Sequence, residues 1–279
     1  MRQLYDTLTG GAAFRRLLLA WYRGHGRDLP WRRTRDPYAI LVSEVMLQQT
    51  QVSRVATAYG RFLRRFPTLA TLARASLAEV LREWSGLGYN RRARDLHRVA
   101  RASRGALPLT VSELDALPGI GAYTAGAVAC FAYGVRAPFA DTNIRRVLGR
   151  AFLGRTATER EASAIDGSVM ARDAASWHHA LMDIGALFCI RRAPRCDVCP
   201  VRPACRYRGG EVVRARTQQP FASSDRRVRG AIVRALVSGP RTVRSLAREL
   251  SDARVPPLVE GLIAEGLVES VGRRVALPG

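Results

Sequence analysis

Four of the five cysteines gather in one short run, CIRRAPRCDVCPVRPAC, in which Cys189, Cys196, Cys199 and Cys205 are separated by six, two and five residues. Such crowding, in a chain whose one other cysteine is Cys130, indicates a shared ligand. Four converging thiolates suit an iron–sulfur cluster or a structural zinc ion. The spacing matches neither common ferredoxin pattern and lacks two evenly separated CxxC pairs. A disulfide knot is the other interpretation, and it is disfavoured because the chain carries no secretory signal.

The basic side chains also limit the chemistry. All 45 of them are arginine, and the formal net charge is +22. Because the chain has no lysine, lyase catalysis through a lysine imine is excluded. Arginine donates two parallel hydrogen bonds to a phosphate, so this charge indicates an anionic partner, most simply nucleic acid. A generally basic surface is the alternative.

A glycine-rich turn offers a place for a phosphate. Leu117-Pro118-Gly119-Ile120-Gly121 precedes a helical run that begins near Ala122. The two glycines allow a tight turn with exposed N–H groups at a helix N-terminus, where the helix dipole also favours an anion. The alternative is a plain turn between two helices, because a GxG before a helix is weak evidence by itself.

Two carboxylates stand beside runs that could place them at a reaction site. Glu44 lies at helical spacing with Ile40, Leu41 and Leu47, and apolar surroundings favour the protonated carboxyl that a general acid needs. A buried glutamate bonded to backbone or arginine is the structural alternative, and this stretch favours neither. Asp141 directly precedes an arginine-bearing helical run, where it could cap the helix, face a substrate, or do both.

Helices must position these side chains, because strand signals are nearly absent up to residue 208. Apolar residues recur at helical spacing, and glycine or proline interrupts the runs. The predicted helices cover residues 12–23, 37–48, 51–66, 69–73, 76–84, 90–104, 112–116, 122–133, 142–152, 159–172 and 175–188. The main body is therefore expected to be all-α, without internal repeats.

The last segment has a different pattern. Helical runs at 226–237, 242–250 and 255–265 are followed by LVES, a Val271-Gly272 turn and RRVALP, which predict a β-hairpin. Three short helices and a hairpin are typical of a winged helix. Its seven arginines between 226 and 248 slightly favour contact with DNA or protein over a mere packing role.

Five motifs occur in an order that is typical of one known family. They are SEVMLQQTQV, GLGY followed by RRARDLH, LPGIGAYTAGAV, DTNIRRVL and the cysteine run. Together they resemble the helix-hairpin-helix base-excision DNA glycosylases, and in particular the MutY-type adenine glycosylases, over residues 14–208. SEVMLQQT is specific to the MutY branch, whereas the hairpin and the cysteine run are shared with the endonuclease III branch.

The resemblance implies a two-lobed all-α fold with DNA bound between the lobes, and a 4Fe-4S cluster held by Cys189, Cys196, Cys199 and Cys205. The expected division is a cluster lobe of residues 1–30 and 149–208, a lobe of residues 31–148 with the helix-hairpin-helix motif, a linker over 209–224, and a small winged-helix-like α+β domain over 225–279.

The resemblance also assigns roles to single residues. Glu44 matches the general acid that protonates the adenine leaving group, and Asp141 matches the carboxylate that stabilises the oxocarbenium-like sugar. Asn143 and Tyr123 match polar residues that help position these groups. The positions matched to DNA contacts are Gln48, Gln49, Tyr89, Arg32, Gly119 and Gly121. The implied reaction removes adenine opposite 8-oxoguanine or guanine from double-stranded DNA, after the base has been flipped out of the stack.

Tyr123 stands where the lyase branch of this superfamily has its lysine, so a monofunctional enzyme that leaves an abasic site is expected. Two features depart from the family. The chain after residue 209 is too short for the Nudix-like domain that reads 8-oxoguanine, and Asn90 replaces a frequent second tyrosine. Relatives with tyrosine at this hairpin position can instead remove thymine or uracil opposite guanine. A thymine or uracil mismatch glycosylase and a non-catalytic protein that binds damaged DNA are therefore the alternatives.

The remaining expectations concern context. No segment is long and apolar enough to span a membrane, so a cytoplasmic, nucleoid-associated bacterial monomer is expected. His25, His97, His178 and His179 are predicted to be surface or packing residues, and Cys130 a small core residue.

Overall fold

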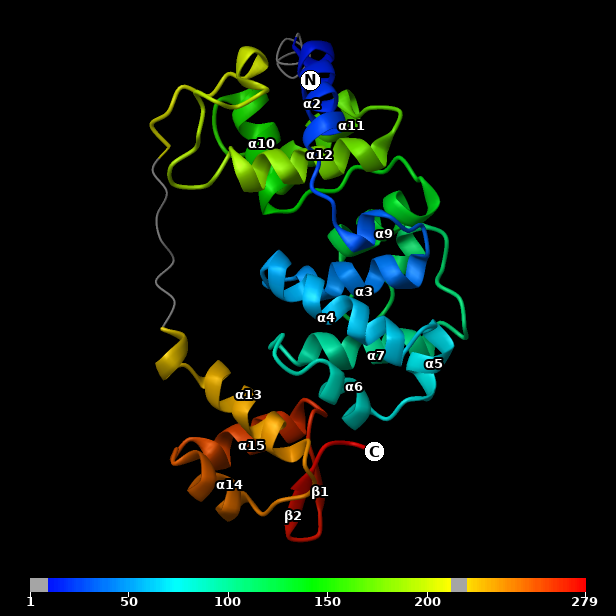
Figure 1. The fold of residues 1–279 in the computed structure, drawn as a ribbon, viewed down its shortest axis with the longest axis vertical. Coiled ribbons are helices and arrows are strands. Elements are labelled where there is room, and N and C mark those ends of the chain that lie inside the picture. Colours follow the sequence, from blue (N-terminus) through cyan, green and yellow to red (C-terminus); the bar gives the residue numbers. More distant parts are fainter. Residues whose placement is uncertain (1–9, 212–219) are drawn as a thin grey trace. The chain divides into compact units, whose positions relative to one another are not determined.

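The computed structural model describes residues 10–211 and 220–279, which form two compact units (Figure 1). The first takes in residues 10–40, 109–115 and 120–211, and the second takes in 41–108, 116–119 and 220–279. Helix α3 (Pro37–Leu47) runs from the first into the second. Within these described ranges, no helix is both long and apolar enough to cross a membrane.

The predicted all-α body is confirmed, with helices close to the expected ranges. In the first unit they are α2 (Gly11–His25), η2 (Pro30–Arg32), α8 (Val111–Asp115), α9 (Ala122–Tyr133), α10 (Thr142–Leu153), α11 (Glu159–Val169), α12 (Ala174–Leu187) and η3 (Arg202–Ala204). In the second they are α4 (Val52–Arg65), α5 (Leu69–Arg74), α6 (Leu77–Glu83), α7 (Arg91–Ala102), η4 (Phe221–Ser223), α13 (Asp225–Leu236), α14 (Val243–Leu250) and α15 (Val255–Ala264). Capping boxes at Thr68, Ser76 and Thr158 fix the starts of α5, α6 and α11.

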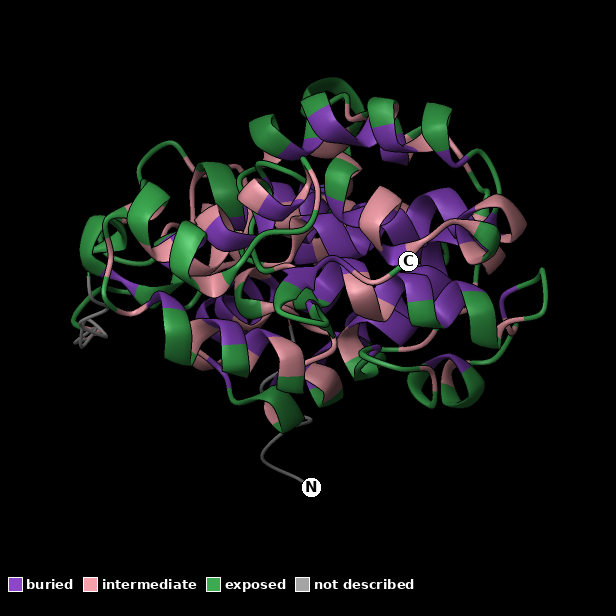
Figure 2. Ribbon diagram, turned by 90° about the horizontal axis from the view of Figure 1, so that it is seen from below, coloured by how far each residue is buried: buried purple, intermediate pink, exposed green. Residues whose placement is uncertain are grey.

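The core of the first unit is an aromatic contact between three helices. Phe14 of α2 meets Phe152 of α10 and Trp177 of α12 edge-on, with ring centroids 5.2 and 6.0 Å apart. Helix α9 is buried along almost its whole length, and it packs so closely that a Cβ on Gly126 would lie only 2.7 Å from Cβ of Phe139. Figure 2 shows the buried stretches in purple against the exposed outer faces of the helices in green.

A buried cysteine, histidine and aspartate lie together in this core. Asp166 accepts hydrogen bonds from Trp177 Nε1 at 2.7 Å and from His178 Nε2 at 2.8 Å, and Cys130 Sγ lies 3.7 Å from His178 Nδ1. Cys130, His178 and Asp166 are each at most 1% exposed, so no substrate can reach the Cys130 thiol. Cys130 and His178 are packing residues, as expected from the sequence.

In the second unit, Phe62 packs edge-on against Phe66 and Trp84, which fixes α4 against α6. The C-terminal domain, residues 220–279, adds α13, α14, α15 and an antiparallel hairpin of β1 (Glu269–Val271) and β2 (Arg274–Ala276). Arg241 forms a further antiparallel bridge with Val275. This arrangement confirms the winged-helix-like prediction.

The observed division differs from the expected one at the hairpin helices. Residues 120–148 belong with the cysteine-bearing segment rather than with residues 41–108. The physical reason is packing: α10 and α9 both lie against α12, whose buried face includes Trp177 and Ile184. Sequence periodicity could show that these helices exist, but not which neighbours they pack against.

Candidate active site and cysteine-lined pocket

Asp141 is held rigidly at the start of α10. Its Oδ1 accepts hydrogen bonds from the backbone N–H groups of Asn143 at 2.9 Å and Ile144 at 2.7 Å, and its Oδ2 accepts one from Asn143 Nδ2 at 2.8 Å. Asp141 is therefore an N-cap, as one interpretation of the sequence held, and it remains partly exposed. Three donors and the helix dipole fix the carboxylate in one orientation, which suits a group that must face a developing positive charge.

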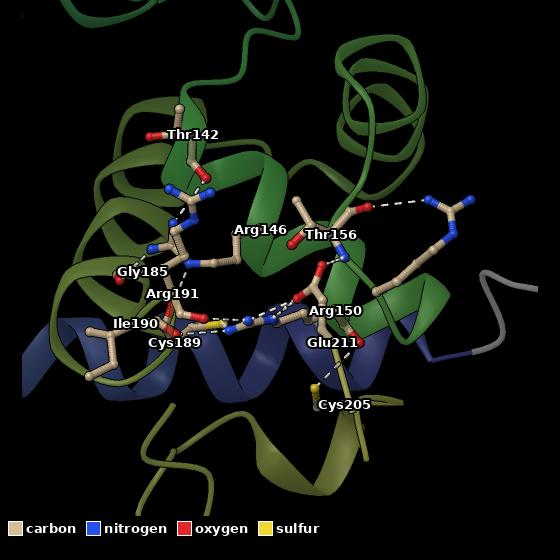
Figure 3. A network of polar contacts seen from close by, with 11 residues as sticks. Thr142, Arg146, Arg150, Thr156, Gly185, Cys189, Ile190, Arg191, Cys205 and Glu211 are labelled. Carbon is tan, nitrogen blue, oxygen red and sulfur yellow. Dashed lines mark hydrogen bonds and ion pairs between the residues drawn. The ribbon is translucent and has the colours of Figure 1, made fainter. Parts of the chain in front are cut away.

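Asn143 connects this carboxylate to a buried arginine. Its Oδ1 accepts a hydrogen bond from Arg146 at 2.8 Å, and the same arginine nitrogen donates to the carbonyl of Gly185, also at 2.8 Å. Nε of Arg146 donates to the carbonyl of Cys189 (Figure 3). Gly185 cannot carry a side chain, because a Cβ there would lie 2.7 Å from Cβ of Asn143. An unbroken hydrogen-bonded path thus runs from Asp141 to the first cysteine of the run.

The four cysteines of the run line one pocket, together with apolar side chains. Val147, Ala151, Ile184 and Val201 are among the other lining residues. Burial raises the pKa of Cys199 to about 11 and also raises the pKa of Cys205. Among the described residues, no three His, Cys, Asp or Glu side chains are arranged to hold a single metal ion. Four soft sulfur donors around an apolar pocket fit an iron–sulfur core that is larger than one ion.

Arg150, one turn after Arg146 on α10, holds the backbone of the cysteine loop. It is 1% exposed and donates to the carbonyls of Ile190 and Arg191 at 2.9 and 3.0 Å, and to Cys189 Sγ at 3.6 Å (Figure 3). Its Nε donates to Glu211 at 2.9 Å, and Glu211 also accepts the N–H of Thr156 at 2.8 Å. A charged hydrogen-bonded network therefore holds the loop against α10.

Arg32 lies in a buried ion pair. Its two terminal nitrogens each lie 2.8 Å from an oxygen of Asp183, and its side chain is 7% exposed. Arg27 donates to the same carboxylate from its Nε at 2.6 Å and its backbone N–H at 2.9 Å. Burial alone would raise the pKa of Asp183, but the bonds and charges of Arg32 and Arg27 lower it. Contact of Arg32 with DNA stays a prediction. In this conformation its guanidinium joins η2 to Asp183 of α12.

The two hairpin glycines have different roles. Gly119 has φ of 73° and lies so close to Asp95 that a Cβ would be 2.6 Å from the Cβ of that residue, so both backbone and space require glycine. Gly121 caps α9 with an extended φ of −113° and nothing near its missing Cβ. The N-terminus of a helix is where an anion seat is expected. Tyr123 follows in the first turn, partly exposed, with its ring edge-on to Phe139 at 5.6 Å.

Glu44 is 5% exposed on α3, whose residues from Tyr38 to Met46 are all buried. This burial agrees with both interpretations of the sequence, the general acid and the structural glutamate. Its role as a general acid stays a prediction.

The residues predicted to probe the duplex stand on unusual backbone. Gln49 and Tyr89 have φ of 55° and 49°, and they are two of only four non-glycine residues with positive φ in the described chain. Such conformations cost energy and persist where the surroundings impose them, often at functional sites. Both residues are exposed, Tyr89 by 39%.

Arg92 joins the two segments that carry Gln49 and Tyr89, and no sequence pattern predicted this role. Its guanidinium is buried, and it stacks over the rings of Trp84 and Tyr89, 5.4 Å from each centroid. It donates to Thr50 Oγ1 and to the carbonyl oxygens of Val45, Met46, Gln48, Leu87 and Gly88. Burial lowers the pKa of Arg92 to about 10, which leaves it charged at neutral pH. Arg92, Arg146 and Arg150 all escaped prediction, because each is one arginine among 45.

Comparison with known proteins places the chain in a family. Residues 42–166 match the model of the HhH-GPD superfamily base excision DNA repair proteins. The chain is 43% identical to the adenine DNA glycosylase of Mycolicibacterium smegmatis, over 94% of this chain and 95% of that protein. It is 40% identical to the adenine DNA glycosylase of Mycobacterium tuberculosis H37Rv, over 94% of this chain and 92% of that protein.

Among solved structures, a thermostable thymine-DNA glycosylase superposes with a TM-score of 0.67 and 28% identity, over 72% of this chain and 97% of the other. The fold, the hairpin, the cysteine run and the near full-length match to the mycobacterial proteins lead to one assignment. The chain belongs to the helix-hairpin-helix base-excision DNA repair superfamily, among its adenine DNA glycosylases.

Proposed function

We propose that this protein is a monofunctional DNA glycosylase that removes adenine opposite 8-oxoguanine or guanine. The observation that carries the proposal is the carboxylate of Asp141, which accepts three N–H hydrogen bonds and is partly exposed, in a chain that also buries Glu44. Hydrolysis of an N-glycosidic bond leaves positive charge on the sugar and negative charge on the base. One carboxylate and one carboxylic acid can stabilise these two charges.

In the proposed mechanism the hairpin holds the DNA backbone through the amides at the start of α9. Gln48, Gln49 and Tyr89 probe the duplex while the adenine leaves the stack, which costs a few kcal/mol. Glu44 donates its proton to a ring nitrogen of the flipped adenine. Asp141, oriented by Asn143, stabilises the oxocarbenium-like sugar until water adds to it.

Lysine-dependent lyase activity is not expected, because of the side chains at hand. An imine with the opened sugar needs an amine, and the position of the family's lysine is occupied by the phenol of Tyr123. The product is therefore an intact strand with an abasic site, which alkali but not the enzyme itself should cleave.

Four cysteines fit a 4Fe-4S cluster, by the nature and number of the sulfur donors around their pocket. When bound, the cluster would supply a rigid anchor for the loop between Cys189 and Cys205. Arg150 and Arg146 would hold that anchor against α10, and hence against the helix start that carries Asp141. Purified protein should be brown and contain iron, whereas a colourless zinc protein would contradict this assignment.

A thymine or uracil mismatch glycosylase is the second candidate. It is favoured by the structural similarity to a thymine-DNA glycosylase and by the tyrosine at position 123. The adenine assignment has stronger support, because the mycobacterial relatives match over nearly the whole chain at higher identity.

One panel of labelled duplexes separates these candidates. It contains adenine opposite 8-oxoguanine, adenine opposite guanine, thymine opposite guanine and uracil opposite guanine, each treated with alkali after incubation. We expect cleavage at adenine only. Cleavage at thymine or uracil would establish the second candidate, and no cleavage anywhere would leave a non-catalytic DNA-binding protein. Light scattering on the same sample tests the expected monomer.

A further inference from the structure

The loop that carries Tyr89 is anchored by the C-terminal domain. Tyr89 follows Gly86 and Gly88, whose φ values of 92° and 72° turn the chain sharply before α7. Its phenol oxygen lies 2.8 Å from a terminal nitrogen of Arg226, which donates to it. The Arg226 guanidinium also lies 6.0 Å from the centre of the ring. A residue 137 positions later in the chain thus holds an exposed residue that is predicted to probe DNA.

Arg226 is itself well fixed, because the C-terminal domain is bonded to α6 and α7. Glu265, just after α15, accepts hydrogen bonds from Arg91 of α7 and from Arg229 of α13. The Glu265 backbone carbonyl accepts another from Arg94. The Arg91 hydrogen bond is the main cause that lowers the pKa of Glu265, so this carboxylate stays ionised. One glutamate therefore connects the helix that bears Arg226 to the helix that follows Tyr89.

The end of the chain adds a second connection. The carbonyl of Pro278 accepts the backbone N–H of Ala78, at the start of α6, at 3.0 Å. The domain therefore contacts α6 as well as α7, which limits its freedom to turn relative to Tyr89.

The usual mode of a winged helix does not explain this domain. In that mode the third helix enters the DNA groove and reads base edges with polar side chains. Here the third helix, α15, has the sequence VPPLVEGLIA, and its exposed residues are Pro256, Pro257, Glu260 and Ala264. It offers no arginine and one negative charge. The domain instead contacts Tyr89 through Arg226 of α13.

We propose that Arg226 is a positioning residue for Tyr89, and that the C-terminal domain thereby sets the preference for the base opposite the excised adenine. The inference rests on the proposed adenine glycosylase activity. A probing side chain held in one conformation loses less entropy when it enters the duplex, and it discriminates better between two partner bases. The match to the adenine DNA glycosylase of Mycolicibacterium smegmatis covers 94% of this chain. The part of this chain outside the match is shorter than the C-terminal domain, so most of the domain lies within the match.

The test is a double-mutant cycle on the full-length protein. Arg226→Met keeps an apolar stem and removes the donors, and Tyr89→Phe keeps the ring and removes the acceptor. The matched control is Arg234→Met, which removes an exposed arginine from the same helix. For each protein, single-turnover rates are measured on duplexes with adenine opposite 8-oxoguanine and opposite guanine, and the ratio of the two rates is compared.

We expect Arg226→Met and Tyr89→Phe each to change this ratio by about 3- to 10-fold, the effect of one hydrogen bond to a charged donor at a partly exposed site. The double variant should show the same ratio as either single variant, because both remove one interaction. Arg226→Lys should restore part of the ratio, and Arg234→Met should keep the wild-type value. Melting temperature and visible absorbance, followed in parallel, should stay at wild-type values.

Three results would overturn the inference: a wild-type ratio in Arg226→Met, independent effects that add in the double variant, or an equal loss of rate on both duplexes with a lower melting temperature. In each case adenine release by the wild-type protein would leave the proposed function standing. If the wild-type protein releases no adenine from either duplex, the proposed function fails, and this inference fails with it.

Discussion

Two regions of this protein hold their functional residues in opposite ways. Asp141 sits on regular structure, as the cap of α10, and partly buried hydrogen bonds through Asn143 and Arg146 lead from it to the cysteine loop. Gln49 and Tyr89 sit on loops with positive φ, and long side chains from elsewhere in their own unit hold them. The first region is built to keep one charge in one place. The second presents exposed side chains, which are predicted to meet whichever base lies opposite the adenine.

The comparison predicts different consequences of damage. Changes near Asp141 should slow the chemical step to the same extent on every duplex, because the sugar is the same in all of them. Changes near Tyr89 should alter the discrimination between duplexes, because the base opposite adenine differs. The predictions below test this distinction.

The largest effect is expected from Asp141→Asn. Asparagine is as good an N-cap as aspartate, so α10 should keep its start, but the negative charge facing the sugar is lost. Single-turnover adenine release should fall on the order of 10³-fold, equally opposite 8-oxoguanine and guanine. The melting temperature should stay close to wild type. A rate within threefold of the wild-type value would remove Asp141 from the mechanism.

Arg146→Met should break the hydrogen-bonded path between the cysteine loop and the carboxylate of Asp141. It leaves the buried carbonyls of Gly185 and Cys189 without this donor, which should lower the free energy of unfolding by about 2–4 kcal/mol. Iron content and adenine release should fall together, again equally on both duplexes. Arg160→Met, at an exposed position of α11, is the control. Normal iron content with unchanged rates would show that the path has no role.

Arg92→Met should instead act on discrimination. The variant loses the donor that joins the Gln48 backbone to the turn before Tyr89, so both loops should become mobile. We expect the ratio of rates on the two adenine duplexes to change by about 10-fold, a larger change than in either half of the Arg226–Tyr89 pair, because several hydrogen bonds are lost. An equal loss on both duplexes would erase the proposed difference between the two regions.

The smallest effect expected is the contribution of His179 to the loss of stability at low pH. Burial, aided by the charge of Arg32, lowers the pKa of His179 to about 3, and its ring stacks on Phe131 at 4.2 Å. The unfolded chain binds a proton at this histidine below about pH 6.5 whereas the folded chain does not, so stability should fall as pH drops from 6.5 toward 3. His179→Phe should weaken this fall. Melting temperatures at pH 7 and pH 5 check it, and parallel curves for the two proteins would contradict it.

Local patterns predicted the parts of the site that lie close together in the chain. Asp141 as a cap and the gathering of the four cysteines could be read from short spacings, and so could α10, which begins after Asp141. Arg146 and Arg92 could not, because their partners become neighbours only in the folded chain: the carbonyl of Cys189 is 43 positions from Arg146, and that of Gln48 is 44 positions from Arg92. In a chain without lysine, an arginine that binds phosphate and one that binds a buried carbonyl look the same.

The most direct test of the central claim is the identity of the products from one turnover. Wild-type protein and Glu44→Gln are each mixed in excess with a duplex that carries adenine opposite 8-oxoguanine, and the products are analysed by mass spectrometry. The account predicts free adenine and an intact abasic strand from the wild type, and little or none of either from Glu44→Gln. A strand already cleaved at the abasic site, no free adenine from the wild type, or full activity in Glu44→Gln would contradict it.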